Sequence, residues 1–479
     1  MTRAEFDTLA ASAPEALYAL FQAQAAQLAA LTARVAQLEA RVGGHSQNSH
    51  RPPSSDGPRT PPRSQRERSG KAPGGQPGHR GQTLTMVATP DTVVAHHPAA
   101  CGQCGASLAD MPAVAVARRQ VVDLPPLTLA VTEHQAATVC CPRCRAQTVA
   151  AFPGQVAAPV QYGPRLLGLG VYLRHYQLLP YARIRETLRD LFGAGPACDT
   201  LAMAGAAAHA ALAPVEAAIR DALAAALLAH TDETGIRVAG RREWVHVVST
   251  ARLTHYARHA KRGQIATAAI GLLPRLSGRL IHDGWASYWH YPGAHGLCNA
   301  HHLRELTAVA EQAGQGWAAD LHALLRAMLR HVHQGRAAGR VASPPDECAA
   351  FVARYRAALA AGYAANPPPT RTPEGPQRGR LKRTPARNLL DRLSAHEDAV
   401  LAFLHDWTVP FDNNQAERDL RMLKVQQKIS GTFRDAAGAD VFCRLRGYLA
   451  TLRKQGQPLL AALALTLAGQ PPLPALLPG

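Results

Sequence analysis

The sequence predicts an α/β protein in which a domain built on a β-sheet follows three smaller parts. These are a coiled coil, a zinc-ribbon-like domain and a helical segment. Short β-type runs are concentrated between residues 227 and 282, and two of them end in an aspartate. Helical patterns stand on both sides of that region. Two Cys-x-x-Cys pairs occur in a separate segment nearer the N-terminus.

The charge of the chain favours a polyanionic partner. Its 479 residues include 52 Lys and Arg against 34 Asp and Glu, a formal net charge of +18 with a pI near 10.0. A field of this sign attracts nucleic acid, although an Ala- and Arg-rich composition raises the charge for unrelated reasons too. With 47% hydrophobic residues the chain has apolar material for two or three domains, which excludes a disordered protein.

The N-terminus and the apolar runs predict a cytoplasmic protein with no membrane segment. Glu5 and Asp7 stand where a secretory leader would be basic. Apolar runs such as Leu459 to Leu467 are far shorter than the ~20 residues that span a bilayer. We therefore expect a protein of the cytosol.

Residues 1–43 have the pattern of a helix with a heptad seam, in which apolar side chains alternate at spacings of four and three. The seam consists of Leu17, Phe21, Leu28, Leu31, Val35, Leu38 and Val42. About four heptads are enough to hold two chains together. We favour a homo-oligomer, with docking of the stripe on its own chain as the alternative.

Residues 44–82 are predicted to be a basic linker rich in Pro, Ser and Gly. Seven basic and two acidic residues occur between positions 51 and 82. This composition cannot form a core. The linker either contacts phosphates without reading sequence or is simply solvated.

Residues 90–152 are predicted to form a small zinc-binding domain. Its two Cys-x-x-Cys pairs are separated by 36 residues and consist of Cys101 with Cys104 and Cys141 with Cys144. Each pair folds as a tight knuckle, and two knuckles complete a tetrahedral thiolate site that stabilises a domain too small to fold alone. Runs at 114–122 and 127–132 are strand-like. We expect structural Zn²⁺, because a full sulfur shell leaves no position open for a substrate.

Residues 160–226 are predicted to be helical and to contain a pair resembling a helix-turn-helix. The first helix spans Tyr181 to Phe192, and Asp199 is the expected N-cap of a second that runs through Leu212. The second helix is mostly Ala, Leu and Met and lacks the side chains that read base edges. We interpret the pair as packing. DNA contact is the alternative, through Arg174, Arg183, Arg185 and Arg189.

The catalytic domain, residues 227–450, begins with four predicted strands. The first, Leu227 to Thr231, leads directly into Asp232, and the fourth, Arg279 to His282, leads into Asp283. The second and third are expected at 243–250 and 253–258. If the first and fourth strands are neighbours, both carboxylates emerge at one edge and share a metal ion, as in the core of a ribonuclease-H-like fold. Taken alone, either aspartate is equally a turn residue.

A third carboxylate, Glu417, lies on a later helix that Asp412 is expected to cap. The buried stripe of this helix is predicted to be Ala416, Leu420 and Leu423, and cations share the face of Glu417. We expect the cations of this helix and the following segment to contact DNA: Arg418, Arg421, Lys424, Lys428 and Arg434. In isolation, the segment also fits a solvated amphipathic helix.

Three carboxylates suit two Mg²⁺ ions, or Mn²⁺ in their place, held roughly 4 Å apart. Such a pair activates a water or a 3′-hydroxyl and stabilises the departing oxygen in phosphodiester chemistry. Histidine and thiolate ligands would suit magnesium poorly. The acidic residues therefore predict metal-dependent chemistry on nucleic acid.

In their order along the chain, these features resemble the transposases of the insertion sequence 66 family. Besides the helix, linker and cysteine pairs, the motifs are Asp232-Glu-Thr, Asp283-Gly-Trp, Cys298-Asn-Ala-His301 with Arg304, and Asp412-Asn-Asn-x-Ala-Glu-Arg-x-Leu-Arg421. The resemblance implies a DDE transposase with a ribonuclease-H-like core and a helical insertion at about 307–405. It also implies that Asp232, Asp283 and Glu417 bind the metal.

The activity that this resemblance implies is cleavage at the ends of an insertion sequence and strand transfer into target DNA. The partners would be double-stranded DNA and companion proteins of the same element. The protein would then be bacterial, and associated with the nucleoid when it is bound to DNA. Two alternatives remain: a DNA-binding regulator that has lost catalysis, and a nuclease that hydrolyses without joining.

Several segments depart from the family pattern or stay open. Trp285 stands where Tyr is common, and residues 299–302 and 428–434 also differ. Cys298 and His301 are either a metal pair or a core-packed turn. A cationic run in the insertion is either a phosphate-tracking loop or merely a basic linker: Arg378, Arg380, Lys382, Arg383 and Arg387. Residues 451–479 are expected to be a C-terminal tail.

Overall fold

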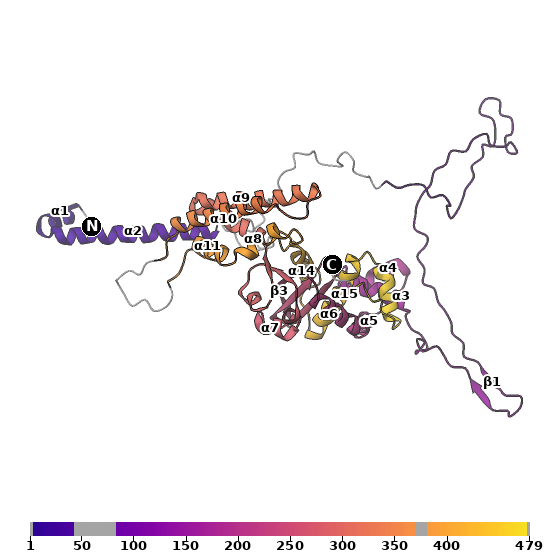
Figure 1. The fold of residues 1–479 in the computed structure, drawn as a ribbon. Helices are drawn as coiled ribbons and strands as arrows, with labels where there is room; N and C mark the ends of the chain where they lie inside the picture. Colours follow the sequence, from indigo (N-terminus) through magenta and orange to yellow (C-terminus); the bar gives the residue numbers. More distant parts are fainter. Residues whose placement is uncertain (1–2, 43–82, 370–380, 477–479) are drawn as a thin grey trace.

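A five-stranded mixed sheet lies at the centre of the computed structural model, which describes residues 3–42, 83–369 and 381–476 (Figure 1). Its strands are β3 (Leu228–Val238), β4 (Arg241–Ser249), β5 (Thr254–His259), β6 (Arg279–His282) and β7 (His295–Leu297). The strand order is β5-β4-β3-β6-β7. The first three strands along the chain pair antiparallel, whereas β6 and β7 run parallel to β3. The fold is thus of the predicted α/β kind.

The central strand β3 is longer than its apolar run. The prediction that it ends at Thr231 is wrong, because β4 pairs with it as far as Val238 and so keeps the polar residues from Asp232 onward in the sheet. The two strands are joined by a two-residue turn at Ala239 and Gly240, whose φ angles of 48° and 76° suit the twist of a hairpin. Asp232 therefore lies within a strand rather than at its end.

Helices that precede and follow the strands in the sequence pack together on one side of the sheet and beside it. They are α3 (Pro164–His175), α4 (Tyr181–Phe192), α5 (Cys198–Ala211), α6 (Ala213–Ala224), α15 (Ala436–Lys454) and α16 (Leu459–Leu467). Leu223, Val248 and Leu445 belong to one buried apolar cluster, so the sheet shares a core with these helices, except that α4 packs in a separate cluster with α5. The N-cap of α5 is Ala197, not Asp199 as predicted. Residues 451–479, expected to be a tail, contain α16 within this core.

The other face of the sheet is covered by α14 (Asn414–Ser430). Its predicted stripe is buried, because Leu420 and Leu423 pack with Ile236 and Val245 of the sheet. This packing decides which face of α14, and so which of its charged side chains, stays accessible. Shorter elements complete this part: α7 (Gln264–Ile270), η2 (Leu273–Arg275) and η3 (Ala286–His290).

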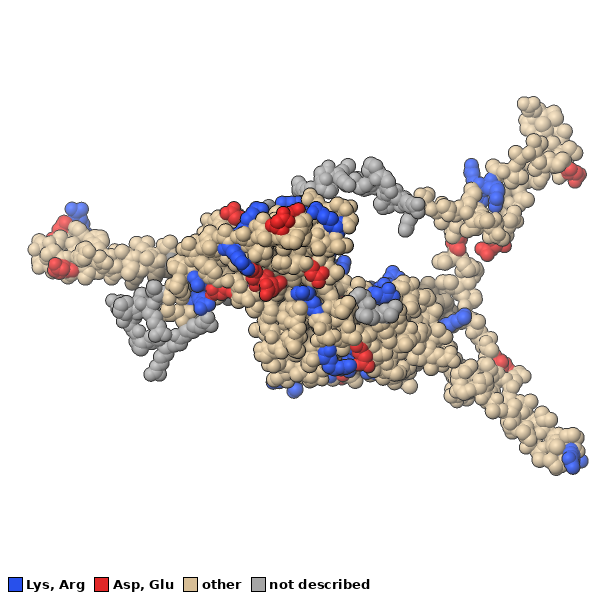
Figure 2. Space-filling view, in the orientation of Figure 1, with Lys and Arg blue, Asp and Glu red and all other residues tan. Residues whose placement is uncertain are grey.

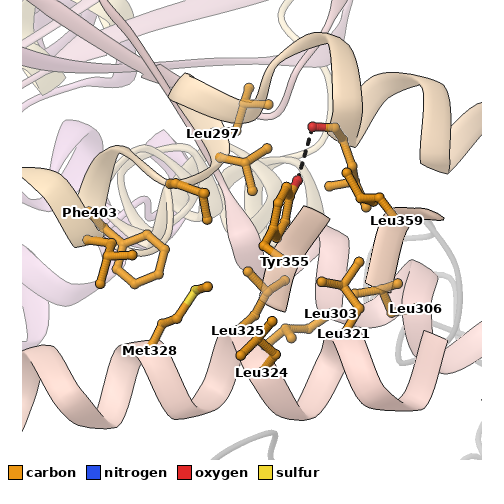
Figure 3. Close-up of a cluster of buried hydrophobic side chains, with 14 of the residues drawn as sticks. Leu297, Leu303, Leu306, Leu321, Leu324, Leu325, Met328, Tyr355, Leu359 and Phe403 are labelled. Carbon is orange, nitrogen blue, oxygen red and sulfur yellow. Dashed lines mark hydrogen bonds between the residues drawn. The ribbon is translucent and has the colours of Figure 1, made fainter. Parts of the chain in front are cut away.

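The helical insertion has its own apolar core. It consists of α8 (Asn299–Ala313), α9 (Gly316–Ala337), α10 (Pro345–Ala365), α11 (Pro385–Ala395), α12 (Glu397–Val400) and α13 (Ala402–His405). It begins at residue 299 rather than near 307, directly after β7. Figure 3 shows part of this core, which includes Leu324, Met328 and Tyr355; the Tyr355 hydroxyl donates to the carbonyl of Leu393 at 3.0 Å. The insertion is therefore a packed bundle fastened to the edge of the sheet.

The N-terminal segment forms two helices, α1 (Arg3–Ser12) and α2 (Pro14–Val42), instead of the single helix predicted. Pro14 lacks the amide hydrogen that would continue α1 and suits the first turn of α2. Seam residues Phe21, Leu28 and Leu31 are exposed in this single chain. The predicted linker lies outside the described residues, and so do Arg378 and Arg380.

Residues 83–163 are largely extended and exposed. Their two strands, β1 (Thr138–Cys140) and β2 (Gln147–Val149), form a hairpin at the end of an arm (Figure 1). The strands predicted at 114–122 and 127–132 are absent, since no partner strand lies beside these runs in the described chain. No single described helix is both long and apolar enough to cross a membrane, and one bent pair, α5 with α6, meets that test by length and composition only.

Candidate active site

Two predicted site residues, Asp232 and Asp283, lie on neighbouring parallel strands. β3 and β6 pair with Leu228 beside Arg279. Both aspartates lie four positions beyond that pair, so the same register sets them side by side where β6 has just ended. Residues in register on parallel neighbours point to the same face of a sheet. The expectation that the first and fourth strands adjoin is confirmed, and it brings the two carboxylates together.

Asn413 fastens the start of α14 to this edge of the sheet. Its side-chain amide donates to the carbonyl of Thr231 at 2.8 Å, and its Oδ1 accepts from the ring of His230 at 2.9 Å. Its backbone N–H donates to Sγ of Cys298 at 3.2 Å. Asn413 is only 1% exposed. The helix therefore begins beside the strand that carries Asp232.

Two adjacent residues, Asp412 and Asn413, have different roles at the start of α14. Asn413 occupies the N-cap position, but its side chain makes no cap hydrogen bond. The carboxylate of Asp412 accepts from the N–H of Asn414 at 3.0 Å, so it does bind the helix start as expected. Glu417 follows in the first turn of the helix. Because the Asp412 carboxylate bonds the helix start, the Asn413 side chain is available to bond the sheet.

The predicted triad holds negative charge in a poorly solvated place. Burial raises the pKa of Asp232 well above its usual range, and the charges of Glu233, Asp283 and Glu417 raise it further, against a hydrogen bond from the N–H of Glu233 at 2.8 Å. Burial likewise raises the pKa of Glu417, and the nearby Arg304 opposes that effect. A divalent cation relieves such crowding of carboxylates.

The neighbouring carboxylate Glu233 is neutralised by its own partners. Nε of Arg262 donates to Oε1 of Glu233 at 2.8 Å, and the hydroxyl of Tyr288 donates to the other oxygen. The Arg262 guanidinium in turn lies 4.8 Å from the centre of the Trp244 ring and 4.2 Å from that of Trp285. The Glu233 carboxylate is thus engaged by Arg262 and Tyr288, in a network of side-chain contacts beside the site.

Glu417 meets two further donors from the start of the insertion. One ligand atom from each of Cys298, His301 and Glu417 lies within 4.8 Å of the other two. Nδ1 of His301 lies 3.9 Å from Oε1 of Glu417. Burial raises the pKa of Cys298 to about 12, and the charge of Glu417 adds to this effect. The three triad carboxylates do not form such a close group in the described chain.

Four of the predicted DNA-contacting cations lie on the exposed side of α14, and the fifth, Arg434, follows this helix. The five residues Arg418, Arg421, Lys424, Lys428 and Arg434 are all exposed. Nζ of Lys424 donates to the carbonyl of Gly235 at 3.1 Å, at the edge of β3. Among the alternative contacts, Arg183, Arg185 and Arg189 are exposed on α4, whereas Arg174 donates to Ser430 at 2.9 Å.

The two cysteine pairs adopt matching turns. In each turn the first thiol, Cys101 or Cys141, accepts N–H groups of the two residues that end the turn, and these bonds lower its pKa. Gly105 and Arg145 follow with positive φ angles of 74° and 57°. The structure brings each pair together, but no three of the four sulfurs lie within 4.8 Å of one another.

Sequence reasoning missed Asn413, Glu233 and Arg262. For Asn413 the sequence offered one signal, the two asparagines that follow Asp412. If Asp412 caps the helix, the capping does not explain why Asn413 is polar. Arg262 carries no local signal, since it meets Glu233 only through the pairing of β3, β4 and β5. The grouping of Glu417 with Cys298 and His301 also required the fold.

We expect Asn413→Ala to destabilise the protein by about 1–3 kcal/mol, because it leaves the Thr231 carbonyl and the His230 ring buried without this partner. Chemical denaturation measures the effect. Asn414→Ala is the matched control, since Asn414 is exposed and its side chain bonds only Asp412 across the turn. Equal stability of the two variants would contradict the role assigned to Asn413.

Comparisons with known proteins bear on the same region. Residues 159–441, more than half of the chain, match the family model described as Transposase IS66 family. Residues 3–85 match a family of unknown function, DUF6444. A comparison with curated proteins found no match. The matched region contains the sheet, the helical insertion and all three predicted triad residues, and the chain belongs to the IS66 transposase family.

Proposed function

We propose that the protein is a DDE transposase that cuts DNA at the ends of an insertion sequence and joins them to target DNA. Asp232, Asp283 and Glu417 are its metal-binding residues in this proposal. The observation that carries it is the register that sets Asp232 beside Asp283 on parallel strands, with the first turn of α14 fastened next to them by Asn413. The strand order and directions of the sheet also support a ribonuclease-H-like core.

The residues present fit a pair of magnesium ions. All three side chains offer hard carboxylate oxygens, which Mg²⁺ and Mn²⁺ prefer. Oε1 of Glu417 is buried and accepts no hydrogen bond, so a ligand position is available. The raised pKa of Asp232 reflects crowded negative charge that a cation would offset. Such ions, when bound, activate the attacking oxygen and stabilise the leaving one.

In this proposal, the chain's own residues position the DNA and keep a fourth carboxylate from binding the metal. Asp232 and Asp283 are fixed by the sheet, and Glu417 approaches from the helix. Arg262 and Tyr288 hold Glu233 as a counter-charged neighbour, which keeps this fourth carboxylate away from the metal. The exposed cations of α14 then face the phosphates on either side of the scissile bond.

The face of the molecule in Figure 2 carries mixed charge. On the face shown in Figure 2, Lys and Arg side chains lie over both the sheet region and the insertion, with acidic side chains interspersed. A mixed surface of this kind does not read sequence by charge alone, so the proposal assigns the α14 cations to phosphate contact. The exposed seam of α2 is proposed to pair two chains, since it leaves large apolar side chains in water.

The cysteine pairs are proposed to hold structural zinc. Their N–H donors lower the pKa of the first thiol of each pair and so favour the thiolate that zinc requires. The matching turns present two thiolates each. Closing of the two extended arms onto one ion would complete a four-sulfur shell.

Substitution of the triad tests the proposed chemistry. We expect Asp232→Asn, Asp283→Asn and Glu417→Gln each to reduce cleavage and joining by about a thousandfold or more, the equivalent of ~4 kcal/mol, because each removes a metal ligand. DNA binding should persist. The assay uses DNA carrying the element's ends with Mg²⁺, and Asp320→Asn on the exposed surface of α9 is the matched control.

The wild-type result separates the alternatives. Binding without cleavage would indicate a regulator, and cleavage without joined product would indicate a hydrolytic nuclease. Full strand transfer by any triad variant would show that the triad is wrongly assigned.

The crowding of carboxylates predicts a pH-dependent stability. Because the pKa of Asp232 is raised in the folded chain, stability falls as the pH rises from the ordinary aspartate value of 3.8 through the raised value, and stays lower at neutral pH. We expect metal-free Asp232→Asn to unfold a few degrees above the wild type at neutral pH. The difference in unfolding temperature between the variant and the wild type should become smaller in acid. It should also become smaller with Mg²⁺, because the ion stabilises only the wild type. Differential scanning calorimetry measures both, and a variant less stable than wild type at neutral pH would count against the assignment.

Metal analysis tests the zinc proposal. Purified protein should contain about one zinc per chain at the cysteine pairs, and Cys101→Ser should remove it, since three thiolates bind less tightly than four. Cys140→Ser is the control, because this thiol adjoins Cys141 but belongs to neither pair. Zinc retained in full after Cys101→Ser would refute the site.

A further inference from the structure

Beside Glu417 lie two side chains that the proposed reaction does not use. Cys298 is the N-cap residue of α8, and His301 lies in the first turn of the same helix. Together with Glu417 they form a group whose ligand atoms all lie within 4.8 Å of one another. In the described part of the chain, no other His, Cys, Asp or Glu residues form a group of three this close. Their chemistry differs from that of the aspartates.

The donors are held by the fold from two sides. The N–H of Cys298 donates to the carbonyl of His282 at 2.9 Å, which fixes the start of α8 against β6. Sγ of Cys298 accepts the N–H of Asn413, the residue that anchors α14. The thiol and the glutamate are therefore positioned by the same contact between the two helix starts. Bonding of a ligand thiol to a backbone N–H is the kind of support that orients metal ligands.

The spacing requires little movement to become a metal site. Bonds of ~2.3 Å to sulfur and ~2.0 Å to nitrogen and oxygen set tetrahedral donors about 3.3–3.5 Å apart. His301 and Glu417 already lie 3.9 Å apart. The Cys298 side chain is buried, whereas those of His301 and Glu417 are 18% and 32% exposed. Three protein ligands leave one tetrahedral position for water.

The donor set selects a different ion from that of the aspartates. Thiolate and imidazole favour Zn²⁺ and similar borderline or soft cations, whereas Mg²⁺ requires hard oxygen and retains its water. Glu417 is common to both sets. It forms a close three-donor group with Cys298 and His301 but not with Asp232 and Asp283.

We propose that Cys298, His301 and Glu417 form a zinc site, and that zinc bound there withholds Glu417 from the catalytic metal ions and so inhibits the enzyme. The existence of the site is independent of the reaction, whereas the inhibition rests on the proposed function. Zinc and magnesium then compete for one carboxylate, and free zinc acts as a brake on DNA cleavage and joining.

Two measurements on the full-length protein test this proposal. In the first, Zn²⁺ is titrated into the strand-transfer assay at constant Mg²⁺. The wild type should be inhibited, and Cys298→Ser should need at least about tenfold more zinc, since even supporting residues of a metal site change affinity 10- to 100-fold. His301→Ala should shift the inhibition in the same direction. Cys443→Ser is the control, because Cys443 is equally buried but lies on α15.

The second measurement is independent of activity. Co²⁺ bound to a thiolate gives a near-ultraviolet sulfur-to-cobalt absorption band. In Cys298→Ser the intensity of this band should fall by the contribution of one thiolate. In Asp232→Asn and Cys443→Ser the intensity should be unchanged. If Cys298→Ser is misfolded by circular dichroism, His301→Ala decides the matter through its loss of one cobalt per chain in equilibrium dialysis.

The outcomes separate this proposal from the proposed function. Equal zinc sensitivity of the wild type and Cys298→Ser, or an unchanged cobalt band, overturns the zinc site. Active triad variants together with a cobalt band that depends on Cys298 would refute the transposase mechanism and the inhibition, but leave the site standing.

Discussion

The side chain of Asn413 joins parts of the chain that are more than a hundred residues apart. It binds the backbone of β3 beside Asp232, and its own N–H binds the thiol at the start of α8. Because it is buried, each of these polar groups depends on the others for its hydrogen bonds. The sheet, the helical insertion and α14 meet at this residue. This junction and the packing of α14 on the sheet together bring Glu417 toward the aspartates.

This junction keeps several carboxylates close together, in a place where burial and mutual repulsion of their charges lower the stability of the fold. Asp232 is buried among other carboxylates, and only part of that charge is offset by Arg304 near Glu417. The apolar cores on either side supply the rigidity that keeps the group assembled. One core lies under the sheet and includes α16, and the other fills the helical insertion (Figure 3). A group of carboxylates of this kind is least stable without a cation, as expected of residues that are proposed to bind metal.

In the proposed zinc site, the insertion has a chemical role as well as a structural one. By starting directly after β7, it places Cys298 and His301 against the helix that carries Glu417. The glutamate therefore stands between hard donors on the sheet and softer donors on the insertion. The choice between these two environments is the simplest way in which the fold links the bundle to the proposed chemistry.

The sequence by itself determined the local elements and the residue types of the site. The helix from Tyr181 to Phe192 and the strand from Arg279 to His282 have the predicted bounds, because their periodicity and flanking residues are local. The order of motifs also indicated the family, which the family model supports.

The tertiary structure decided what local pattern does not encode. β3 continues past its apolar run because β4 pairs with it, and the expected tail folds because α3 offers α16 a surface. The partners of Asn413 lie 182 and 183 residues away in the chain. Hydrogen-bond partners and burial arise from contacts between distant segments, and such contacts override the propensity of the residues that make them.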